Sequence, residues 1–253
     1  MLSLALAPWR RPPVLLRNAD VPHYAASTMK VAVLAAVHRS GLAPDREIPV
    51  VNRFRSAAGG TYAHDPAQDS DPAPWELLGR TAPLGWLAAR MVSHSSNLAT
   101  SLCTAAVGPE AVAEVWRRAG ASAASGSPRG IEDAAARAAG IDNTVTAHDL
   151  LRLLASLEPA VLARLEDNAH AVDLAAGLPP GTRLASKNGW VDGVRHSAAV
   201  VRPPDAPPYV LAVCYTGPLA NGQDTGDPAA RLLARLSARV WDHRHRLAGP
   251  AGS

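Results

Sequence analysis

The sequence predicts an α/β fold, in which an antiparallel sheet with flanking helices carries an inserted all-helical subdomain. Strand-like segments near both ends of the chain, a helical middle and a closing amphipathic helix predict this arrangement. The terminal strands can pair only if the helical middle is inserted between them. We expect a single domain over residues 1–253, with its α/β part from residues 1–26 and 150–253 and its helical part from residues 27–149.

Apolar runs and chain breakers place the elements of the first quarter. Two short apolar runs, at residues 2–7 and 13–17, are typical of strands joined by a turn rich in Arg and Pro. The segment YAASTMKVAVLAAVHRSG predicts a helix that begins at small residues and stops at Gly41. Residues 52–74 are rich in Gly, Ala, Asp and Pro and indicate a long surface excursion.

The middle of the chain has a helical pattern from Trp75 to Trp116. The pattern is interrupted near residues 93–97 and at Gly108, so we expect several helices rather than one. An irregular stretch follows at residues 120–130.

The last part begins with a helix and continues with strands. Thr146 and Asp149 resemble a capping box with Asp in place of Glu, just ahead of the run LLRLLASL. Later segments with the composition of strands are residues 183–187, 195–202 and 209–216. The chain closes on an amphipathic helix over residues 228–245, whose apolar stripe consists of Leu232, Leu233, Leu236, Val240 and Trp241.

Charge, the first residues and the cysteines indicate which partners and which cellular location to expect. The formal net charge is +3, and the densest basic run, Arg239 to Arg246, is expected as a solvated helix end, so no nucleic-acid partner is indicated. The first residues lack a basic stretch ahead of a long apolar run, so we expect a cytoplasmic protein with no membrane segment. Cys103 and Cys214 lie in apolar surroundings and are expected to be buried free thiols.

The sequence gives no positive signal for a cofactor. The nine histidines show no ligand spacing, so no metal site and no other cofactor is expected. One loop combines a histidine with acidic residues, for which a solvated loop is favoured over a cation site: His64, Asp65, Asp69 and Asp71.

Of the 25 basic residues, two are lysines, Lys30 and Lys187, and the other 23 are arginines. A chain that solvates its surface with Arg retains Lys where a compact ammonium with an adjustable pKa is needed. The alternative is a compositional bias toward arginine in which the two remaining lysines stand at random positions. The residues around each lysine decide between these interpretations.

Each lysine belongs to a short motif. Ser27 to Lys30 form an S-x-x-K motif at the start of the first predicted helix, where a spacing of three brings the two side chains within reach. The helix N-terminus favours a nearby oxyanion, and a neutral lysine can make the serine a nucleophile. Lys187 begins Lys-Asn-Gly-Trp, predicted to end a strand just before a turn, and Ser95-Ser96-Asn97 lies between the two motifs.

The order S-x-x-K, S-x-N and K-x-G resembles the signature of the serine β-lactamase and penicillin-binding-protein (D,D-peptidase) superfamily. AASTMKVAVLAAV is similar to the nucleophile helix of class A β-lactamases, MVSHSSNLATSL to their second motif, and PPGTRLASKNGWVDGVRHSAAVV to their third motif and the strand after it. NTVTAHDLLRLL resembles the segment that closes the loop below the site. The resemblance runs from about residue 12 to 245 and implies a β-lactamase-like fold.

The resemblance implies a role for each matching residue. Ser27 would attack an acyl carbonyl and become acylated, with Lys30 as its base. Ser95 would pass a proton to the leaving group, and Asn97 would hold the amide side chain of the substrate.

The third motif would complete this site. Lys187 would supply a positive field for Ser95 and, with Asn188 beside Gly189, an anchor for a substrate carboxylate. The backbone N–H groups of Ser27 and Trp190 would form the oxyanion hole. The bulky Trp190 side chain would narrow the acyl pocket.

The chain departs from this family pattern in its deacylation loop and its motifs. Ser96 stands where Asp is usual, and Asn188 replaces the hydroxyl residue of K-T-G. The region that carries the deacylating Glu of class A β-lactamases lacks their W-E-P-E-L-N sequence. Glu132 or Asp133 could take that role, although a solvated or loop-bracing carboxylate is the favoured interpretation of Glu132.

A histidine near the third motif has two interpretations. His196 beside Ser197 resembles a His-Asp pair of the β-lactamase-related hydrolases, with the Asp missing. His196 would line the substrate pocket, or it would be a hydrogen-bonded histidine at a strand edge, which is the favoured interpretation.

We expect a serine hydrolase of the β-lactamase-related type, which cleaves an amide, β-lactam or ester of a small-molecule acyl substrate through a Ser27 acyl-enzyme. One alternative is an acyltransferase or cyclase with an acceptor other than water, favoured by the weak deacylation loop. Another is a non-catalytic ligand-binding relative, against which the retained motifs argue. The sequence carries no signal for oligomeric state.

Overall fold

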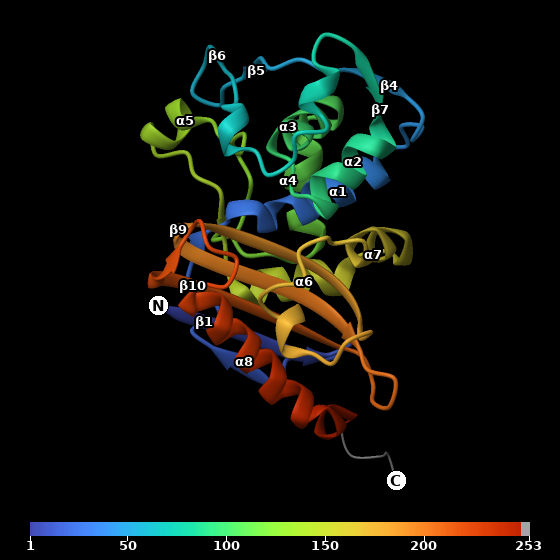
Figure 1. Cartoon of the computed structure of the whole chain (residues 1–253), viewed down its shortest axis with the longest axis vertical. Coiled ribbons are helices and arrows are strands. Elements are labelled where there is room, and N and C mark those ends of the chain that lie inside the picture. The colour runs from blue at the N-terminus through green and yellow to red at the C-terminus, as the bar shows by residue number, and fades with distance from the viewer. Residues whose placement is uncertain (249–253) are drawn as a thin grey trace.

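The computed structural model, which describes residues 1–248, contains a four-stranded antiparallel sheet built from both ends of the chain (Figure 1). Its strands lie in the order β2-β1-β10-β9 and are β1 (Leu2–Pro8), β2 (Leu15–Arg17), β9 (Arg183–Arg202) and β10 (Tyr209–Asn221). β1 pairs with β10 along its whole length, from Leu2 opposite Tyr215 to Pro8 opposite Tyr209. The predicted sheet, in which the two ends of the chain pair, is confirmed.

The rest of the described chain contains eight α-helices. The α-helices are α1 (Lys30–Arg39), α2 (Leu84–Ser93), α3 (Asn97–Val107), α4 (Pro109–Arg118), α5 (Ala134–Ala138), α6 (Ala147–Ser156), α7 (Pro159–Glu166) and α8 (Pro228–Asp242). Short strands and 3-10 turns occupy the connections: β3 (His23–Tyr24), β4 (Glu47–Pro49), β5 (Phe54–Arg55), β6 (Thr61–Tyr62), β7 (Thr81–Pro83), β8 (Thr144–Val145), η1 (Ala26–Met29), η2 (Pro66–Gln68), η3 (Trp75–Leu77), η4 (Ala175–Gly177) and η5 (Arg244–Ala248).

Both faces of the sheet are covered, which explains why β1 is apolar apart from the buried Ser3. Leu4 and Leu6 share a buried cluster with Leu233 of α8. Ala5 and Ala7 belong to a second cluster, which includes the buried leucines of α6. Because alternate residues of a strand point to opposite faces, α8 and α6 cover opposite sides of the sheet (Figure 1).

α1 forms the centre of the helical part of the molecule. Every residue from Lys30 to Ala36 is buried, and α1 contacts α2, α3 and α4. A helix that is apolar on all sides is a core helix, and its many alanines let its neighbours approach closely. Lys30 is the first residue of this helix, so the fold carries an ionisable side chain into the core.

The third motif lies on an element that turns back on itself. β9 contains Gly193 with a φ of 73°, and residues on either side of this point contact one another: the Asn188 amide reaches Ser197, and the Arg195 guanidinium lies 4.7 Å from the Trp190 ring centroid. An Asp-Gly pair favours such a tight reversal. The arms of β9 match the predicted strands 183–187 and 195–202, but Asn188 to Trp190 lie within the first arm. The first arm is therefore longer than the predicted strand, and the chain reverses at Asp192 and Gly193.

Three other regions differ from the sequence-based expectations. The surface excursion 52–74 contains the small hairpin of β5 and β6. Within the region predicted as helical, β7 instead pairs with β4. The helix α7 was not expected, because its sequence shows no clear helical periodicity of apolar residues. The Thr146 cap is confirmed, since its side chain accepts a hydrogen bond from the N–H of Asp149.

Two smaller expectations concern the cysteines and membrane segments. Cys103 and Cys214 are free and buried, as predicted. No helix within residues 1–248 combines the length and the apolar character that crossing a bilayer requires.

Candidate active site

Ser27 lies in η1, the 3-10 turn that leads into α1, and it borders a cavity of about 620 Å³. Ala26 just before it has a φ of 45°, in the left-handed region, so the backbone bends sharply ahead of the serine. The Thr28 hydroxyl and N–H both donate to the carbonyl of Ala25, at 2.6 and 3.2 Å. Ala26, Thr28 and Met29 are buried. The turn therefore presents Ser27 to the cavity.

The first arm of β9 passes directly beside this turn. A Cβ on Gly189 would lie 2.9 Å from the backbone nitrogen of Ser27 and 3.0 Å from that of Thr28. Any side chain at this position would force the strand away from the serine, so glycine is required for the close approach. Trp190 follows Gly189 and borders the same cavity. We expected the N–H groups of Ser27 and Trp190 to form the oxyanion hole. These two residues lie on segments that contact each other.

Ser95 joins the two lysines that the motifs single out. Lys30 Nζ and Lys187 Nζ each donate to Ser95 Oγ at 3.1 Å. Ser95 lies between α2 and α3 with a φ of 63°, a strained conformation for a residue other than glycine. Lys30 Nζ also donates to the Ser95 carbonyl at 2.5 Å, and no hydrogen bond from it to Ser27 is present within residues 1–248. The S-x-x-K lysine is therefore directed at Ser95.

Burial lowers the pKa of both lysines. Lys30 and Lys187 have no solvent-exposed surface. Burial, and then the positive charge of Lys187, bring the pKa of Lys30 well below its usual range. Burial lowers the pKa of Lys187 to about 7. Because desolvation disfavours an ammonium ion, a neutral Lys30 that can accept a proton is easier to form than in an exposed lysine.

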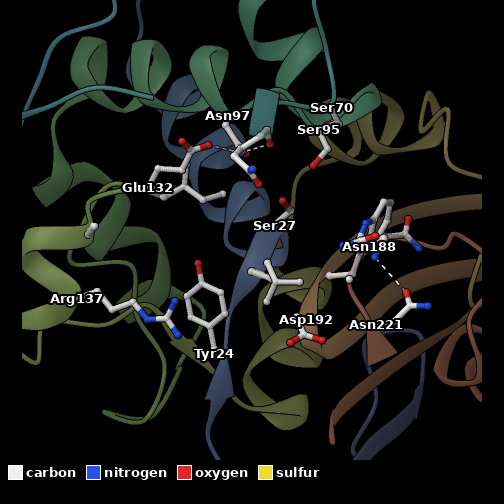
Figure 2. A pocket seen from close by; sticks show the side chains of 18 of the residues that line it. Tyr24, Ser27, Ser70, Ser95, Asn97, Glu132, Arg137, Asn188, Asp192 and Asn221 are labelled. Carbon is white, nitrogen blue, oxygen red and sulfur yellow. Dashed lines mark hydrogen bonds between the residues drawn. The ribbon is translucent and has the colours of Figure 1, made fainter. Parts of the chain in front are cut away.

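Asn97 links Lys30 to Glu132. Its Oδ1 accepts a hydrogen bond from Lys30 Nζ at 2.8 Å, and its Nδ2 donates to Glu132 Oε1 at 2.6 Å (Figure 2). Glu132 Oε2 lies 3.1 Å from His64 Nδ1 and accepts a hydrogen bond from the N–H of Asp65. Burial favours a higher pKa for Glu132, but His64, Asn97 and the Asp65 N–H together hold its pKa below the usual range.

The structure distinguishes between the two acidic candidates of the deacylation loop. Glu132 borders the cavity that contains Ser27. Asp133 is buried and caps α5, and its carboxylate accepts hydrogen bonds from the Ser56 hydroxyl and the Ala57 N–H, both at 2.8 Å. Glu132 is therefore the carboxylate available to a bound substrate, and Asp133 braces the loop.

Asn188 borders the cavity, but its amide is held by buried polar groups. Its Nδ2 donates to Asp173 Oδ2 at 2.5 Å, and its Oδ1 accepts a hydrogen bond from Asn168 at 2.8 Å. Lys187 Nζ bonds to the Asn188 carbonyl at 3.0 Å as well as to Ser95. The two groups expected to anchor a substrate carboxylate are thus already engaged in the protein.

Asp173 and Arg195 form a fully buried ion pair beneath Trp190, with Arg195 Nε 2.7 Å from Asp173 Oδ1. We expect Asp173→Ala to lower the free energy of unfolding by about 3–5 kcal/mol, because it leaves the Arg195 charge buried without this partner. The melting temperature should then fall by roughly 10 °C. Thermal unfolding measures this. Asp205→Ala, which removes an exposed partner of Arg244, is the control and should cause a much smaller fall. Equal losses would contradict the prediction.

His196 does not line the substrate cavity, so its assignment to substrate binding is wrong. The side chain has no exposed surface, and both ring nitrogens bond to the main chain. Nδ1 accepts from the N–H of Tyr215 at 3.1 Å, and Nε2 donates to the carbonyl of Tyr24 at 2.9 Å. Burial lowers the pKa of His196 to about 4, so the ring is neutral. Sequence adjacency to the third motif gave no information about which sheet face the ring would occupy.

Two loop aspartates, Asp69 and Asp173, bond to residues of the second and third motifs. Asp69 accepts hydrogen bonds from the N–H groups of Asn97 and Leu98, at 3.0 and 2.9 Å, and from the Ser96 hydroxyl at 3.2 Å. Asp173 accepts a hydrogen bond from Asn188 Nδ2, which also lies 3.4 Å from Ser197 Oγ. Neither was identified from the sequence, because nothing in a single sequence pairs a loop aspartate with a helix start far along the chain.

The loop that combined His64 with acidic residues uses them separately. His64 Nε2 bonds to Ser101 Oγ at 2.8 Å, Asp69 braces α3, and Asp71 forms an ion pair with Arg90. Among residues 1–248, no group of three or more His, Cys, Asp or Glu side chains is arranged to hold a metal ion.

The fold recurs in solved structures of low sequence identity. A β-lactamase from Xanthomonas campestris has a TM-score of 0.74 and 22% identity, covering 96% of this chain and 91% of its own. A β-lactamase from Sphaerobacter thermophilus has a TM-score of 0.74 and 23% identity, covering 100% and 93%. A mutant of PBP-A, solved as an acyl-enzyme complex with penicillin G, has a TM-score of 0.73 and 19% identity, covering 96% and 90%. These likenesses show the fold.

Family membership rests on the sequence itself. No curated protein matches this sequence. The model of the β-lactamase enzyme family matches residues 10–244, nearly the whole chain and all three motifs. The protein therefore belongs to the β-lactamase enzyme family.

Proposed function

We propose that the protein is a serine hydrolase that cleaves an amide, β-lactam or ester through an acyl-enzyme on Ser27. The observation that carries this proposal is the convergence of two buried lysines of lowered pKa on Ser95 Oγ, in the cavity that Ser27 borders. Burying two ammonium groups side by side costs stability, so a purely structural role would not favour the arrangement. Family membership and fold support a serine hydrolase of the β-lactamase type.

Acylation would proceed through a tetrahedral intermediate. The Ser27 hydroxyl oxygen attacks the carbonyl carbon while its proton passes to the neutral amine of Lys30. The N–H groups of Ser27 and Trp190 stabilise the oxyanion. When the intermediate collapses, the bond to the leaving group breaks and Ser95 gives that group a proton. Lys30 returns the proton to Ser95, so the step leaves acylated Ser27, a neutral leaving group and the original protonation state.

Glu132 is our proposed base for the second half of the reaction. It borders the cavity with Asn97 and could take a proton from a water molecule that attacks the acyl-enzyme. Its lowered pKa makes it a weaker base than an ordinary glutamate. That observation also favours a second candidate function, acyl transfer to an acceptor other than water, because slow hydrolysis lengthens the lifetime of the acyl-enzyme.

Intact-mass spectrometry after mixing the protein with penicillin G or an activated phenyl ester tests the proposal. We expect a mass increase equal to the bound acyl group, located by peptide mapping on the peptide that contains Ser27. Adding hydroxylamine or an amino acid as a competing nucleophile separates the two candidate functions, because an acyltransferase releases the acyl group faster in its presence. The absence of any adduct and any turnover with both reagents would overturn the enzymatic proposal.

Replacing Glu132 with Gln should slow clearance of the acyl-enzyme by about 10²- to 10⁴-fold, the usual contribution of a general base, and change its formation far less. Gln keeps the hydrogen bond to Asn97 within reach but cannot accept a proton from water. Time-resolved intact mass gives both rates. Glu47→Gln, an exposed position on β4, serves as the control. Unchanged clearance in Glu132→Gln would remove Glu132 from the mechanism and leave it as a loop-bracing residue.

A further inference from the structure

The cavity contains a cation that neither lysine accounts for. Arg137 of α5 borders the cavity and is exposed, and its guanidinium forms no hydrogen bond or ion pair with any residue in the described range 1–248. It lies 5.0 Å from the centroid of the Tyr24 ring, and Tyr24 borders the cavity too. A cation held on an aromatic ring keeps its N–H groups free for a ligand while the ring restricts its movement.

The other charges of the cavity wall are already matched or stand apart from Arg137. Arg129 lies 5.5 Å from the same Tyr24 ring, but it pairs with Asp142 and bonds to the carbonyls of Gly130 and Ile131. Glu132 is engaged by His64 and Asn97, as described above. Asp192 belongs to the turn of β9 and lies on the other side of Tyr24 (Figure 2). Arg137 is therefore the wall cation most available to an anionic substrate group.

The position of Arg137 relative to Ser27 indicates which part of a substrate it would contact. Figure 2 shows Ser27 between Ser95 on one side and Tyr24 with Arg137 on the other. Ser95, as the proposed proton donor, faces the leaving group. The acyl portion, which stays on Ser27, then extends toward Tyr24 and Arg137.

We propose that Arg137, held by Tyr24, binds a carboxylate on the acyl portion of the substrate, so that the natural substrate class is an ester or amide of a dicarboxylic or otherwise acidic acyl group. This inference rests on the proposed acyl-enzyme function. It differs from the anchor that the family resemblance implied, since Lys187 and the Asn188 amide are engaged within the protein and the Lys187 pKa lies near 7. A guanidinium stays charged at every pH at which the enzyme would work.

Three chromogenic esters test the location of the anionic subsite. Mono-4-nitrophenyl adipate has a carboxylate on its acyl portion, and its methyl ester is the neutral match with the same leaving group. The hexanoate of 3-carboxy-4-nitrophenol has its carboxylate on the leaving group. For the wild type we expect a kcat/KM for the adipate on the order of tenfold above that for its methyl ester, as one charge-assisted contact provides. The leaving-group carboxylate should give no such gain.

Variants assign this preference to Arg137. Arg137→Met should bring the ratio of the two adipate esters close to one, and Tyr24→Leu should reduce it in part by releasing the guanidinium. Arg235→Met, an exposed arginine on α8, is the matched control and should keep the wild-type ratio. High salt should weaken the preference in the wild type, because the contact is electrostatic.

The outcomes separate the two proposals. Hydrolysis of all three esters by the wild type with no adipate preference, or a preference that survives in Arg137→Met, would overturn the Arg137 subsite and leave the Ser27 acyl-enzyme standing. No hydrolysis of any ester and no adduct on Ser27 would overturn both. A higher kcat/KM for the ester with its carboxylate on the leaving group would place the anionic subsite at Lys187. That result would overturn the assignment to Arg137.

Discussion

Ser27→Ala is expected to abolish the acyl-enzyme and to lower turnover of any substrate by at least about 10⁴-fold, as removal of a catalytic nucleophile does in serine hydrolases. No covalent adduct should appear with penicillin G or an activated ester, because the attacking oxygen is gone. The fold should be retained, since the Ser27 hydroxyl makes no hydrogen bond to another residue within the range 1–248. Intact mass and thermal unfolding check the two halves of this prediction.

The cavity contains other serines that could in principle be acylated, so the assignment of Ser27 as the nucleophile can be tested against them. Ser95 Oγ receives hydrogen bonds from both lysines, so the geometry alone would also permit Ser95 to be the nucleophile. It is, however, nearly buried, at 7% exposed, whereas Ser27 is more accessible from the cavity. Ser95→Ala should slow acylation but still give an adduct on the Ser27 peptide. Ser70→Ala, which removes a hydroxyl bonded to the His94 carbonyl, should also give that adduct. An adduct on Ser27→Ala would overturn the assignment.

The sequence predicted those parts of the fold that local pattern determines. The apolar run of β1 and the stripe of α8 both indicate elements that bury a face, and the Thr146 cap marks the start of α6. The first arm of β9 was predicted to end at Lys187, yet it continues through Asn188 to Trp190. Gly189 permits the approach of this strand to Ser27, a contact that a neighbour distant in sequence imposes.

The motif residues of the candidate site could be predicted from the sequence, but the residues that hold them in place could not. Ser27 and Ser95 border one cavity, and Lys30 and Lys187 both bond to Ser95 behind it. The braces Asp69 and Asp173 come from loops with no motif of their own, and their partners lie elsewhere in the chain. Such supports depend on long-range packing, which a single sequence does not encode in any local pattern.

Lys30→Met is expected to slow acylation by about 10²- to 10⁴-fold, the range for loss of a general base. It should not unfold the protein. At pH 7 an unfolded chain holds Lys30 protonated, whereas burial in the folded state disfavours that charged form and lowers its pKa, so the lysine costs the folded state stability. Met has a similar length and no such cost. Thermal unfolding at neutral pH should therefore show a melting temperature equal to or above that of the wild type.

The Lys30→Arg variant distinguishes a role of Lys30 as proton acceptor from a role of its positive charge alone. An arginine keeps the charge beside Ser95 and Asn97 but does not release its proton in a protein, so it should be as slow as Lys30→Met. The wild-type acylation rate should rise with pH as the coupled lysine pair loses its first proton, and both variants should lack this rise. Acylation rates measured by stopped-flow across the neutral range decide the matter. If Lys30→Arg restores the rate, Lys30 acts through its charge, and the proton from Ser27 must pass to another group.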